Sequence, residues 1–252
     1  MNPSPGGIDP DWFEHAFGDW YRIIYAHRSI EAARPEALFA AQTLQVTSGD
    51  RLLDLCCGTG RHLLHLSAIS ERSIGLDYSR TLLREAQRHL GSRSRLVRAD
   101  MRAIPFVGTL DVIVNFFTSF GYFADPADDV RVIQCLASAL KPSGRFLIDC
   151  MNPSYLVQSL ERESFRESEG YEIRETRWID EEGLRVNKTT EIRQGGRIVR
   201  RLSESVRLYS KEELTGMVRD AGLKVQHVFG DFLGAPFQAS SERMIVAGQK
   251  CR

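Results

Sequence analysis

Residues 52–62 carry the sequence LLDLCCGTGRH, and this stretch decides the fold class of the 252-residue chain. An apolar run that contains Asp54 ends at a Gly-x-Gly turn, and an amphipathic segment begins directly after Gly60. This order predicts a β-strand, a glycine turn and the N-terminus of a helix, whose free N–H groups and dipole attract negative charge. Gly58 and Gly60 also let a ligand approach the main chain closely.

Three more strand-like segments follow this turn, and acidic side chains stand at or near the ends of two of them. Residues 73–77 end in Asp77, residues 95–98 are followed by Asp100, and residues 110–116 form the third segment. An acid at the end of the second strand can accept hydrogen bonds from a ribose diol. Because the carboxyl ends of parallel strands meet at one edge of a sheet, we expect the ligand at that edge.

Helical segments alternate with these strands, which predicts a doubly wound α/β fold with a mostly parallel sheet and helices on both faces. Asp125 is expected to cap one such helix, and residues 145–149 form the fifth strand after it. A later helix begins at Ser210 with a capping box. The last two strands are expected near residues 223–229 and 244–249.

Two regions depart from this alternation. Aromatic residues recur at mostly helical spacing from Asp11 to Tyr25, and a second helix is expected before the first strand. Polar and apolar residues alternate around a Gly195-Gly196 turn, which predicts an antiparallel β insertion after strand five. The expected organisation is an N-terminal helical lid (1–44), a Rossmann-like domain (45–163 and 210–252) and an inserted substrate flap (164–209).

Composition limits the classes of function. Lys+Arg and Asp+Glu both number 33, so the formal net charge is zero, which argues against a dedicated nucleic-acid binder. The five cysteines follow neither a disulfide framework nor metal-ligand spacing, and a reduced compartment is the simpler explanation. With no signal-peptide pattern and no apolar stretch of membrane-spanning length, we expect a cytoplasmic protein. We expect no bound metal, because no His, Asp and Glu residues with ligand spacing stand near the proposed site.

These elements, in this order, resemble the class I S-adenosylmethionine-dependent methyltransferases over about residues 45–150. Residues 54–60 are similar to the first motif of that family, Asp-x-Gly-x-Gly-x-Gly, with Cys56 in place of the first glycine. Asp77 matches the family's residue that holds the ribose. Asp100 and Met101 match the pair beside the adenine, and Asn115 and Phe116 match the fourth motif.

The resemblance implies a seven-stranded sheet in the order 3-2-1-4-5-7-6 and S-adenosylmethionine as cofactor, with S-adenosylhomocysteine as product. Near the end of the aromatic segment, Arg28 can pair with the carboxylate of the donor and Tyr25 can cover its sulfonium. The residues expected to bind the cofactor are Tyr25, Arg28, Asp54, Cys56, Gly58, Thr59, Gly60, Asp77, Tyr78, Asp100, Met101, Asn115 and Phe116.

Methyl transfer from a sulfonium requires little acid–base chemistry, because positive charge is dispersed rather than created. Holding donor and acceptor in line and excluding water can supply most of the effect. His27 can accept a proton from the substrate and, with Tyr25, is the catalytic candidate. The residues expected to contact the acceptor are Phe117, Ser119, Tyr122, Arg207, Tyr209, Phe237 and Arg243.

The leading hypothesis is a metal-independent methyltransferase that acts on a nitrogen or oxygen of a small molecule. A second hypothesis makes RNA or protein the acceptor, although NFFT at residues 115–118 replaces the Asn-Pro-Pro-Tyr motif of base-modifying relatives. A third is a nucleotide-binding or NAD-linked protein, but Leu63 stands where the dinucleotide fingerprint requires its third glycine. We expect no nucleic acid or membrane as partner, and the sequence leaves the oligomeric state open.

Overall fold

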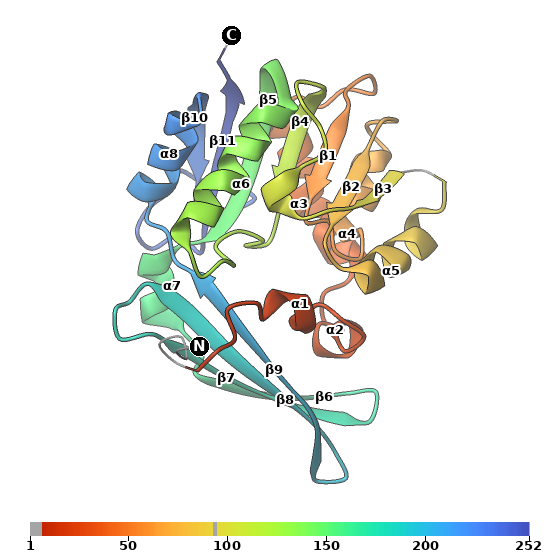
Figure 1. The fold of residues 1–252 in the computed structure, drawn as a ribbon, viewed down its shortest axis with the longest axis vertical. Helices are drawn as coiled ribbons and strands as arrows, with labels where there is room; N and C mark the ends of the chain where they lie inside the picture. Colours follow the sequence, from red (N-terminus) through yellow and green to blue (C-terminus); the bar gives the residue numbers. More distant parts are fainter. Residues whose placement is uncertain (1–6, 93–94, 252) are drawn as a thin grey trace.

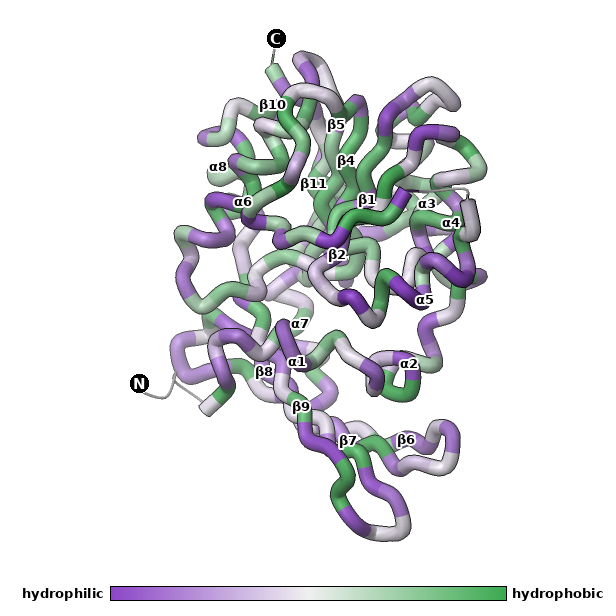
Figure 2. The backbone as a smooth tube through the Cα atoms, turned by 45° about the vertical axis from the view of Figure 1, so that its right-hand side comes forward, coloured by the Kyte–Doolittle hydropathy of each residue, from purple (hydrophilic) through white to green (hydrophobic). Residues whose placement is uncertain are grey.

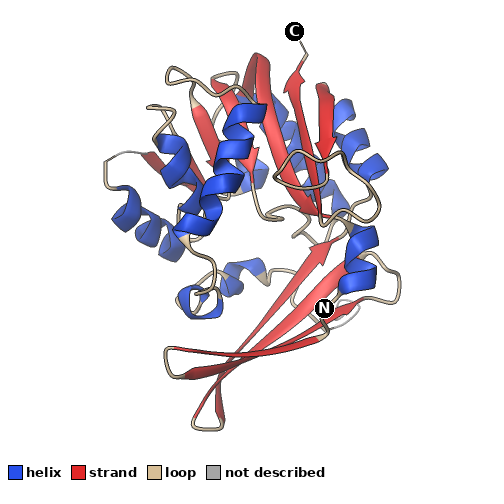
Figure 3. Ribbon diagram, turned by 180° about the vertical axis from the view of Figure 1, so that it is seen from behind, coloured by secondary structure: helices blue, strands red, loops and turns tan. Residues whose placement is uncertain are grey.

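The computed structural model describes residues 7–92 and 95–251, which form a seven-stranded and a four-stranded sheet. The smaller sheet lies beyond one end of the larger one, and the N-terminal helices lie between them (Figure 1). The view from behind shows the same arrangement: the smaller sheet and the N-terminal helices lie at the same end of the large sheet (Figure 3). Residues 1–6 of the expected lid lie outside the described residues.

The large sheet has the order β3-β2-β1-β4-β5-β11-β10. Strands β1 to β5 pair in parallel, and β11 runs antiparallel to both β5 and β10. Numbered by themselves, the seven strands follow the order 3-2-1-4-5-7-6, so the predicted fold class is confirmed. The strands are β1 (Leu52–Leu55), β2 (Ile74–Asp77), β3 (Arg95–Arg98), β4 (Leu110–Asn115), β5 (Leu140–Met151), β10 (Leu223–Phe229) and β11 (Arg243–Lys250).

Helices cover both faces of this sheet. In β1, Leu53 and Leu55 pack into one apolar core and Leu52 into another, as expected of a strand buried on both faces. One face is covered by α3 (Ile30–Thr43), α4 (Arg61–Ser67) and α5 (Arg80–Leu90), and the other by α6 (Pro126–Ala139) and α8 (Lys211–Asp220).

Figure 2 shows the central strands as largely hydrophobic, whereas the strands of the smaller sheet change repeatedly between hydrophilic and hydrophobic residues. Alternation of this kind is typical of a sheet with one face packed and one face exposed. Within the described parts of the chain, no helix combines the length and the apolar character needed to cross a membrane.

The predicted helix starts at α6 and α8 are confirmed. The side chain of Asp125 accepts a hydrogen bond from the Ala127 N–H (2.9 Å) at the start of α6. At α8, Ser210 and Glu213 form the predicted capping box: the Ser210 N–H donates to Glu213 Oε2 (2.8 Å), and the Glu213 N–H donates to Ser210 Oγ (3.2 Å). Both caps satisfy N–H groups that the first helical turn leaves free.

The insertion after β5 is antiparallel as predicted, but it contains one strand more than the alternation indicated. It comprises β6 (Glu163–Ser168), β7 (Tyr171–Ile179), β8 (Arg185–Gln194) and β9 (Arg197–Arg207), paired in that order, and we call this sheet the flap. The sequence of β6, ESFRES, was missed because it carries one large apolar residue, Phe165, which is exposed. A short helix before the flap, α7 (Pro153–Ser159), was also missed, since none of its residues is buried.

The N-terminal aromatic segment does not form the single helix that its spacing predicted. It folds as two one-turn helices, α1 (Phe13–Ala16) and α2 (Tyr21–Ile24). The aromatic rings are spaced to contact the flap and the loop after β4 rather than to form one helical stripe: Trp20 packs edge-on against Tyr171 (5.3 Å between centroids), and Trp12 against Tyr122 (4.9 Å). We call α1, α2 and the following residues up to Arg28 the lid.

Candidate functional site

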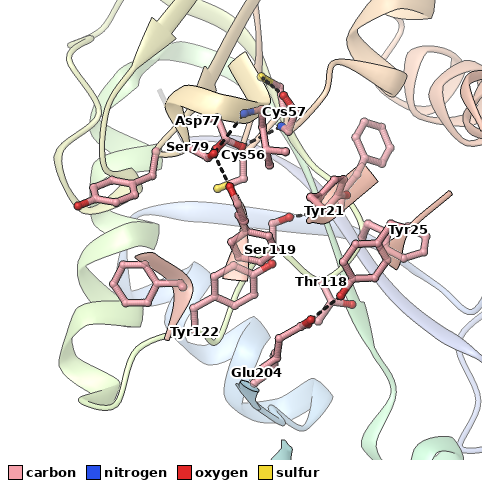
Figure 4. A pocket seen from close by; sticks show the side chains of 18 of the residues that line it. Tyr21, Tyr25, Cys56, Cys57, Asp77, Ser79, Thr118, Ser119, Tyr122 and Glu204 are labelled. Carbon is pink, nitrogen blue, oxygen red and sulfur yellow. Dashed lines mark hydrogen bonds between the residues drawn. The ribbon is translucent and has the colours of Figure 1, made fainter. Parts of the chain in front are cut away.

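A cavity of about 560 Å³ lies at the carboxyl ends of β1 to β4, at the edge where the sequence placed the ligand. The sheet edge forms its floor, and the lid and the flap form its roof (Figures 1 and 4). The predicted site residues that line it are Tyr25, Arg28, Asp54, Cys56, Gly58, Thr59, Asp77, Tyr78, Asp100, Met101, Phe116, Phe117, Ser119, Tyr122 and Arg243.

The turn between β1 and α4 has the left-handed backbone that its glycines predicted. Gly58 has φ 55° and Gly60 has φ 79°. A Cβ atom on Gly60 would lie 3.1 Å from Leu90 Cδ1, so close packing against α5 also favours glycine there. Gly60 caps α4 and is not among the cavity-lining residues. Cys56 is left-handed as well, at φ 62°, and its Sγ lies 3.5 Å from Met101 Sδ.

Asp77 ties this turn to the end of β2. Its Oδ2 accepts a hydrogen bond from the Gly58 N–H (2.8 Å), and its Oδ1 accepts one from the Ser79 N–H (2.8 Å). Burial raises the pKa of Asp77 to about 6, although these backbone hydrogen bonds oppose the shift. The carboxylate therefore fixes the glycine turn and lies at the cavity wall.

Asp54 is the second buried acid at this edge, with 1% of its surface exposed. Its Oδ2 has no hydrogen-bond partner among the described residues. Burial, and then the charge of Asp77, raise its pKa to about 8. A buried carboxyl oxygen without a partner is costly, so this position favours a ligand that brings a positive charge or a donor.

The end of β3 contributes Asp100 and Met101. Asp100 caps a short 3-10 helix, Met101–Ala103, and pairs with Arg102 at 2.7 Å. Arg102 also bridges to Asp128 at 2.9 Å. Met101 is buried beside Cys56, so it forms an apolar surface next to the acidic cap.

The loop after β4 is strained. Phe117 (φ 61°) and Thr118 (φ 58°) are successive left-handed residues, a conformation that non-glycine residues seldom adopt. Asp149 holds them: its Oδ2 accepts from the Phe117 N–H (2.7 Å) and its backbone oxygen from the Thr118 N–H (2.9 Å). Arg243 donates to Asp149 Oδ1 (2.8 Å) and to Thr118 Oγ1 (2.9 Å). The Asp149 side chain is fully buried, so this pair fixes the Phe117 ring at the cavity.

Before this loop, Phe116 lines the floor of the cavity, whereas Asn115, at the end of β4, does not line it and contacts β1 instead. Asn115 Nδ2 donates to the Leu55 backbone oxygen (2.9 Å), and its Oδ1 has no partner among the described residues. The Phe116 ring stacks on His62 with 4.1 Å between centroids. His62 Nε2 lies 2.5 Å from Glu36 Oε2, which fixes the stacked ring at the cavity wall.

The lid contributes Tyr25 and Arg28 to the cavity. The guanidinium of Arg28 lies between two rings, 4.2 Å from the Tyr25 centroid and 4.1 Å from that of Phe117. Arg61, at the start of α4, lies 5.7 Å from the same Phe117 centroid. Neither arginine forms an ion pair with a described residue, so both remain able to bind an anion.

The flap contributes a charged row that the sequence analysis missed. Arg177, Lys188 and Glu204 face one another across β7, β8 and β9, and all three line the cavity. Charged residues in an alternating strand usually mark the solvent side, and only the folded flap shows that this side is turned toward the site. The period-2 pattern places these residues on one face but does not identify what covers it.

Six predicted site residues do not line the cavity, which corrects their expected placement: Gly60 and Asn115, described above, and four that lie elsewhere. His27 is exposed, because the chain turns away after Tyr25. Tyr209 is buried elsewhere and donates to Asp129 Oδ2 (2.7 Å). The Arg207 guanidinium lies over the Tyr209 ring (5.3 Å). Phe237 lines a separate hollow beside Lys211.

Across residues 7–92 and 95–251, no three His, Cys, Asp or Glu side chains gather in a way that would hold a metal ion. The charged groups at the cavity suit an organic ligand. Such a ligand would have sugar-like hydroxyl groups that donate hydrogen bonds at one end and both a positive and a negative charge at the other. Asp77 provides acceptor oxygens at the end of β2, while Asp54, Arg28 and Arg61 provide opposite charges near the glycine turn.

Comparisons with known proteins agree with this geometry. A family model described as a methyltransferase domain matches residues 52–144. The cypemycin N-terminal methyltransferase of a Streptomyces species is 26% identical over 79% of this chain and 82% of that protein. The dTDP-3-amino-3,4,6-trideoxy-alpha-D-glucopyranose N,N-dimethyltransferase of Streptomyces venezuelae is 26% identical over 85% of this chain and 81% of that protein.

The fold also matches solved structures. The CcbJ methyltransferase from Streptomyces caelestis superimposes with a TM-score of 0.79 at 20% identity, covering 95% of this chain and 99% of the other. The match includes the lid and the flap as well as the Rossmann-like domain, because nearly all of both chains is covered. Motif order, sheet order, the site at the sheet edge and the family match agree. The chain therefore belongs to the class I S-adenosylmethionine-dependent methyltransferases, enzymes for which S-adenosylmethionine is the methyl donor.

Proposed function

We propose that this enzyme transfers the methyl group of S-adenosylmethionine to a nitrogen atom of a small molecule, without a metal ion. The observation that carries the proposal is the cavity itself, which the lid and the flap cover above the sheet edge. Its volume of about 560 Å³ is in the range of sites that enclose small ligands. Nitrogen is favoured over oxygen because the names of two relatives specify N-methylation or an amino terminus.

The residues of the floor fit the donor. Asp77 provides carboxylate oxygens for the two ribose hydroxyls, while Met101 and Asp100 border the position of the adenine. The unpartnered Oδ2 of Asp54 suits the ammonium of the amino-acid end. The guanidinium groups of Arg28 and Arg61, which form no ion pair with a described residue, suit its carboxylate. One unpaired acid and two unpaired bases in the same region complement a zwitterion.

When bound, the donor supplies an electrophilic methyl group on a positively charged sulfur. The protein's part is to hold the acceptor nitrogen in line with that methyl group and to keep water out. Phe116, Phe117 and Tyr122 supply apolar walls, and Tyr25 closes the cavity from the lid. Tyr25 and Arg28 then act as cofactor-binding residues of the lid, with no obligatory proton transfer by His27.

A peptide amino terminus is the second candidate acceptor, because one relative is named as an N-terminal methyltransferase. RNA is disfavoured by the zero formal charge of the chain.

Calorimetry with S-adenosylmethionine and S-adenosylhomocysteine, followed by transfer of a radiolabelled methyl group, tests the proposal. The acceptor panel should contain amino-sugar nucleotides, short peptides with a free amino terminus, and the corresponding hydroxyl compounds. We expect saturable binding of both cofactor forms and label only on amines. Label on hydroxyl compounds alone would contradict the choice of nitrogen, and an absence of binding would contradict the whole proposal.

A further inference from the structure

The roof of the cavity contains a partly buried carboxylate, of which one oxygen is anchored by the protein. Glu204 lies on β9 directly opposite Lys188 on β8. Its Oε1 accepts a hydrogen bond from the Tyr25 hydroxyl (2.5 Å) and lies 2.7 Å from Lys188 Nζ. Among the described residues, none donates a hydrogen bond to Oε2, and the side chain, 17% exposed, lines the cavity. One oxygen thus anchors Glu204 while the other is left for a ligand.

The anchoring groups are themselves fixed. Lys188 Nζ donates to the Tyr25 hydroxyl (2.5 Å) and lies 3.6 Å from Glu175. Glu175 is 3% exposed and pairs with Arg166 at 2.8 Å. This chain of contacts joins the lid to all four strands of the flap, so Glu204 is held in place before any ligand arrives. Preorganisation of this kind is what a recognition group requires.

Glu204 differs from the other cavity carboxylates in position. Asp54, Asp77 and Asp100 belong to the floor, where the donor is expected, and Glu242 is exposed to solvent. Glu204 is therefore the partly buried carboxylate that the roof presents to the acceptor. Figure 4 shows it below Tyr25, with the Tyr122 ring on the same side of the pocket and Cys56 and Asp77 across from it.

The surroundings of Glu204 are aromatic. Tyr21 and Tyr25 have ring centroids 4.7 Å apart, and both rings line the cavity with Tyr122. Burial raises the pKa of Tyr122 well above its usual value, and the nearby Cys56 and Glu204 act in the same direction. The phenols are therefore neutral, and together with the carboxylate they make a site that suits an amine and the ammonium formed from it.

We propose that Glu204 Oε2 binds the amino group of the acceptor, and that the acceptor is consequently a primary or secondary amine. The inference rests on the proposed function, and it names the residue that binds the acceptor nitrogen. The neutral amine donates an N–H to Oε2, which turns the nitrogen lone pair toward the donor methyl. The lone pair forms the new N–C bond, the C–S bond breaks, and its electron pair stays on sulfur. The ammonium product keeps its N–H hydrogen bond to Glu204 Oε2 and loses the proton to solvent after it leaves the cavity.

Sinefungin provides a test that needs no identified acceptor. In this donor analogue a carbon bearing an amino group replaces the methylsulfonium, so an ammonium lies near the methyl position. Isothermal titration should compare its Kd with that of S-adenosylhomocysteine for the wild type and for Glu204→Gln. We expect the preference for sinefungin over S-adenosylhomocysteine to fall at least about tenfold in the variant, the scale of one hydrogen bond to a charged group.

Glu191→Gln is the matched control. Glu191 lies on β8 in the same flap, is 22% exposed, and pairs with Arg193 and Arg201 without lining the cavity. Its substitution should leave the preference unchanged. If Glu204→Gln does not fold, the double variant Glu204→Gln with Lys188→Met removes both charges of the pair and should show the same loss.

An unchanged preference in Glu204→Gln would overturn the inference. An equal loss of both ligands would also overturn it, because Glu204 would then hold the lid rather than meet the acceptor. These outcomes differ from failure of the proposed function, in which the wild type would bind neither ligand.

Discussion

The floor and the roof of the cavity are built in different ways. In the floor, a buried strand, its glycine turn and Asp77 follow one another within a short stretch of chain. In the roof, Tyr25 meets Lys188 and Glu204 across more than half of the sequence. The floor is a local structure that many methyltransferases share, whereas the roof depends on strand register and on where the lid docks. We infer that the floor sets the donor and the roof sets the acceptor.

Substitution of Asp77 should have the largest effect on donor binding. Asp77→Ala removes the acceptor for the ribose and leaves the Gly58 and Ser79 N–H groups without their partner. The expected loss is about 3 kcal/mol, on the order of 100-fold in the Kd for S-adenosylhomocysteine. Titration calorimetry measures it, with Glu191→Gln as the control. A change of less than threefold would show that the floor does not bind the nucleoside as described.

The pH dependence of binding separates Asp54 from Asp77. Burial holds the pKa of ligand-free Asp54 at about 8, so the folded protein carries a proton there at neutral pH. An ammonium beside Asp54 favours its ionised form, so binding releases a proton and affinity rises with pH until it levels off above pH 8. Between pH 6.5 and 7.5 the Kd for S-adenosylhomocysteine should fall by about fivefold to tenfold.

Asp54→Asn should bind more weakly and lose most of this pH dependence, since no proton remains to be released. Calorimetry in buffers of different ionisation enthalpy counts the protons directly. Proton uptake by the wild type, or an equal pH slope in the variant, would contradict the role given to Asp54.

The sequence specified the floor because its signals are local. Residues 54–60 and Asp77 sit at strand ends whose positions follow from apolar runs, and a parallel sheet brings those ends together. Glu204 gave no comparable signal, since its role depends on pairing with Lys188 and on the lid above it. Asp149 was missed for the same reason: its partners, Phe117 and Arg243, are distant in sequence.

The misplaced residues have related causes. Phe237 and Tyr209 were assigned to the acceptor because they stand near the ends of the flap and of the last strand. Sequence proximity does not tell which way a loop turns, and both side chains face other parts of the molecule. His27 was chosen for its chemistry beside Tyr25, but the short helix α2 ends at Ile24 and leaves it exposed.

Two buried acids allow a test of whether the loop that carries Phe117 must be held in place for the donor to bind. Asp149 and Asp129 are both fully buried, but Asp149 holds the strained cavity loop and Asp129 pairs with Tyr209 away from it. Asp149→Asn should lower the free energy of unfolding by about 3 kcal/mol, because Arg243 loses its buried partner. It should also weaken S-adenosylhomocysteine binding several-fold through the displaced Phe117 ring.

Asp129→Asn is the control, and it should lower stability without changing the Kd. Chemical denaturation and calorimetry on the same samples give both quantities. Equal effects on binding would mean that Asp149 is structural only. Thr118→Gly in the Asp149→Asn background should restore part of the affinity, because glycine tolerates the left-handed backbone.

The smallest effect is expected at Cys56. Its left-handed backbone suits glycine, the residue that the family motif has there. Cys56→Gly should relieve about 1 kcal/mol of backbone strain and remove a contact with Met101. The two effects nearly offset each other, so we expect a thermal midpoint and a donor affinity close to those of the wild type. A large loss of donor binding would assign the thiol a direct role.

A crystal structure with bound S-adenosylhomocysteine tests the division between floor and roof most directly. It should show the ribose hydroxyls hydrogen-bonded to Asp77 and the sulfur turned toward the flap, with Glu204 Oε2 facing the open side of that sulfur. A nucleoside bound away from Asp77, or a sulfur directed away from Glu204, would contradict the account.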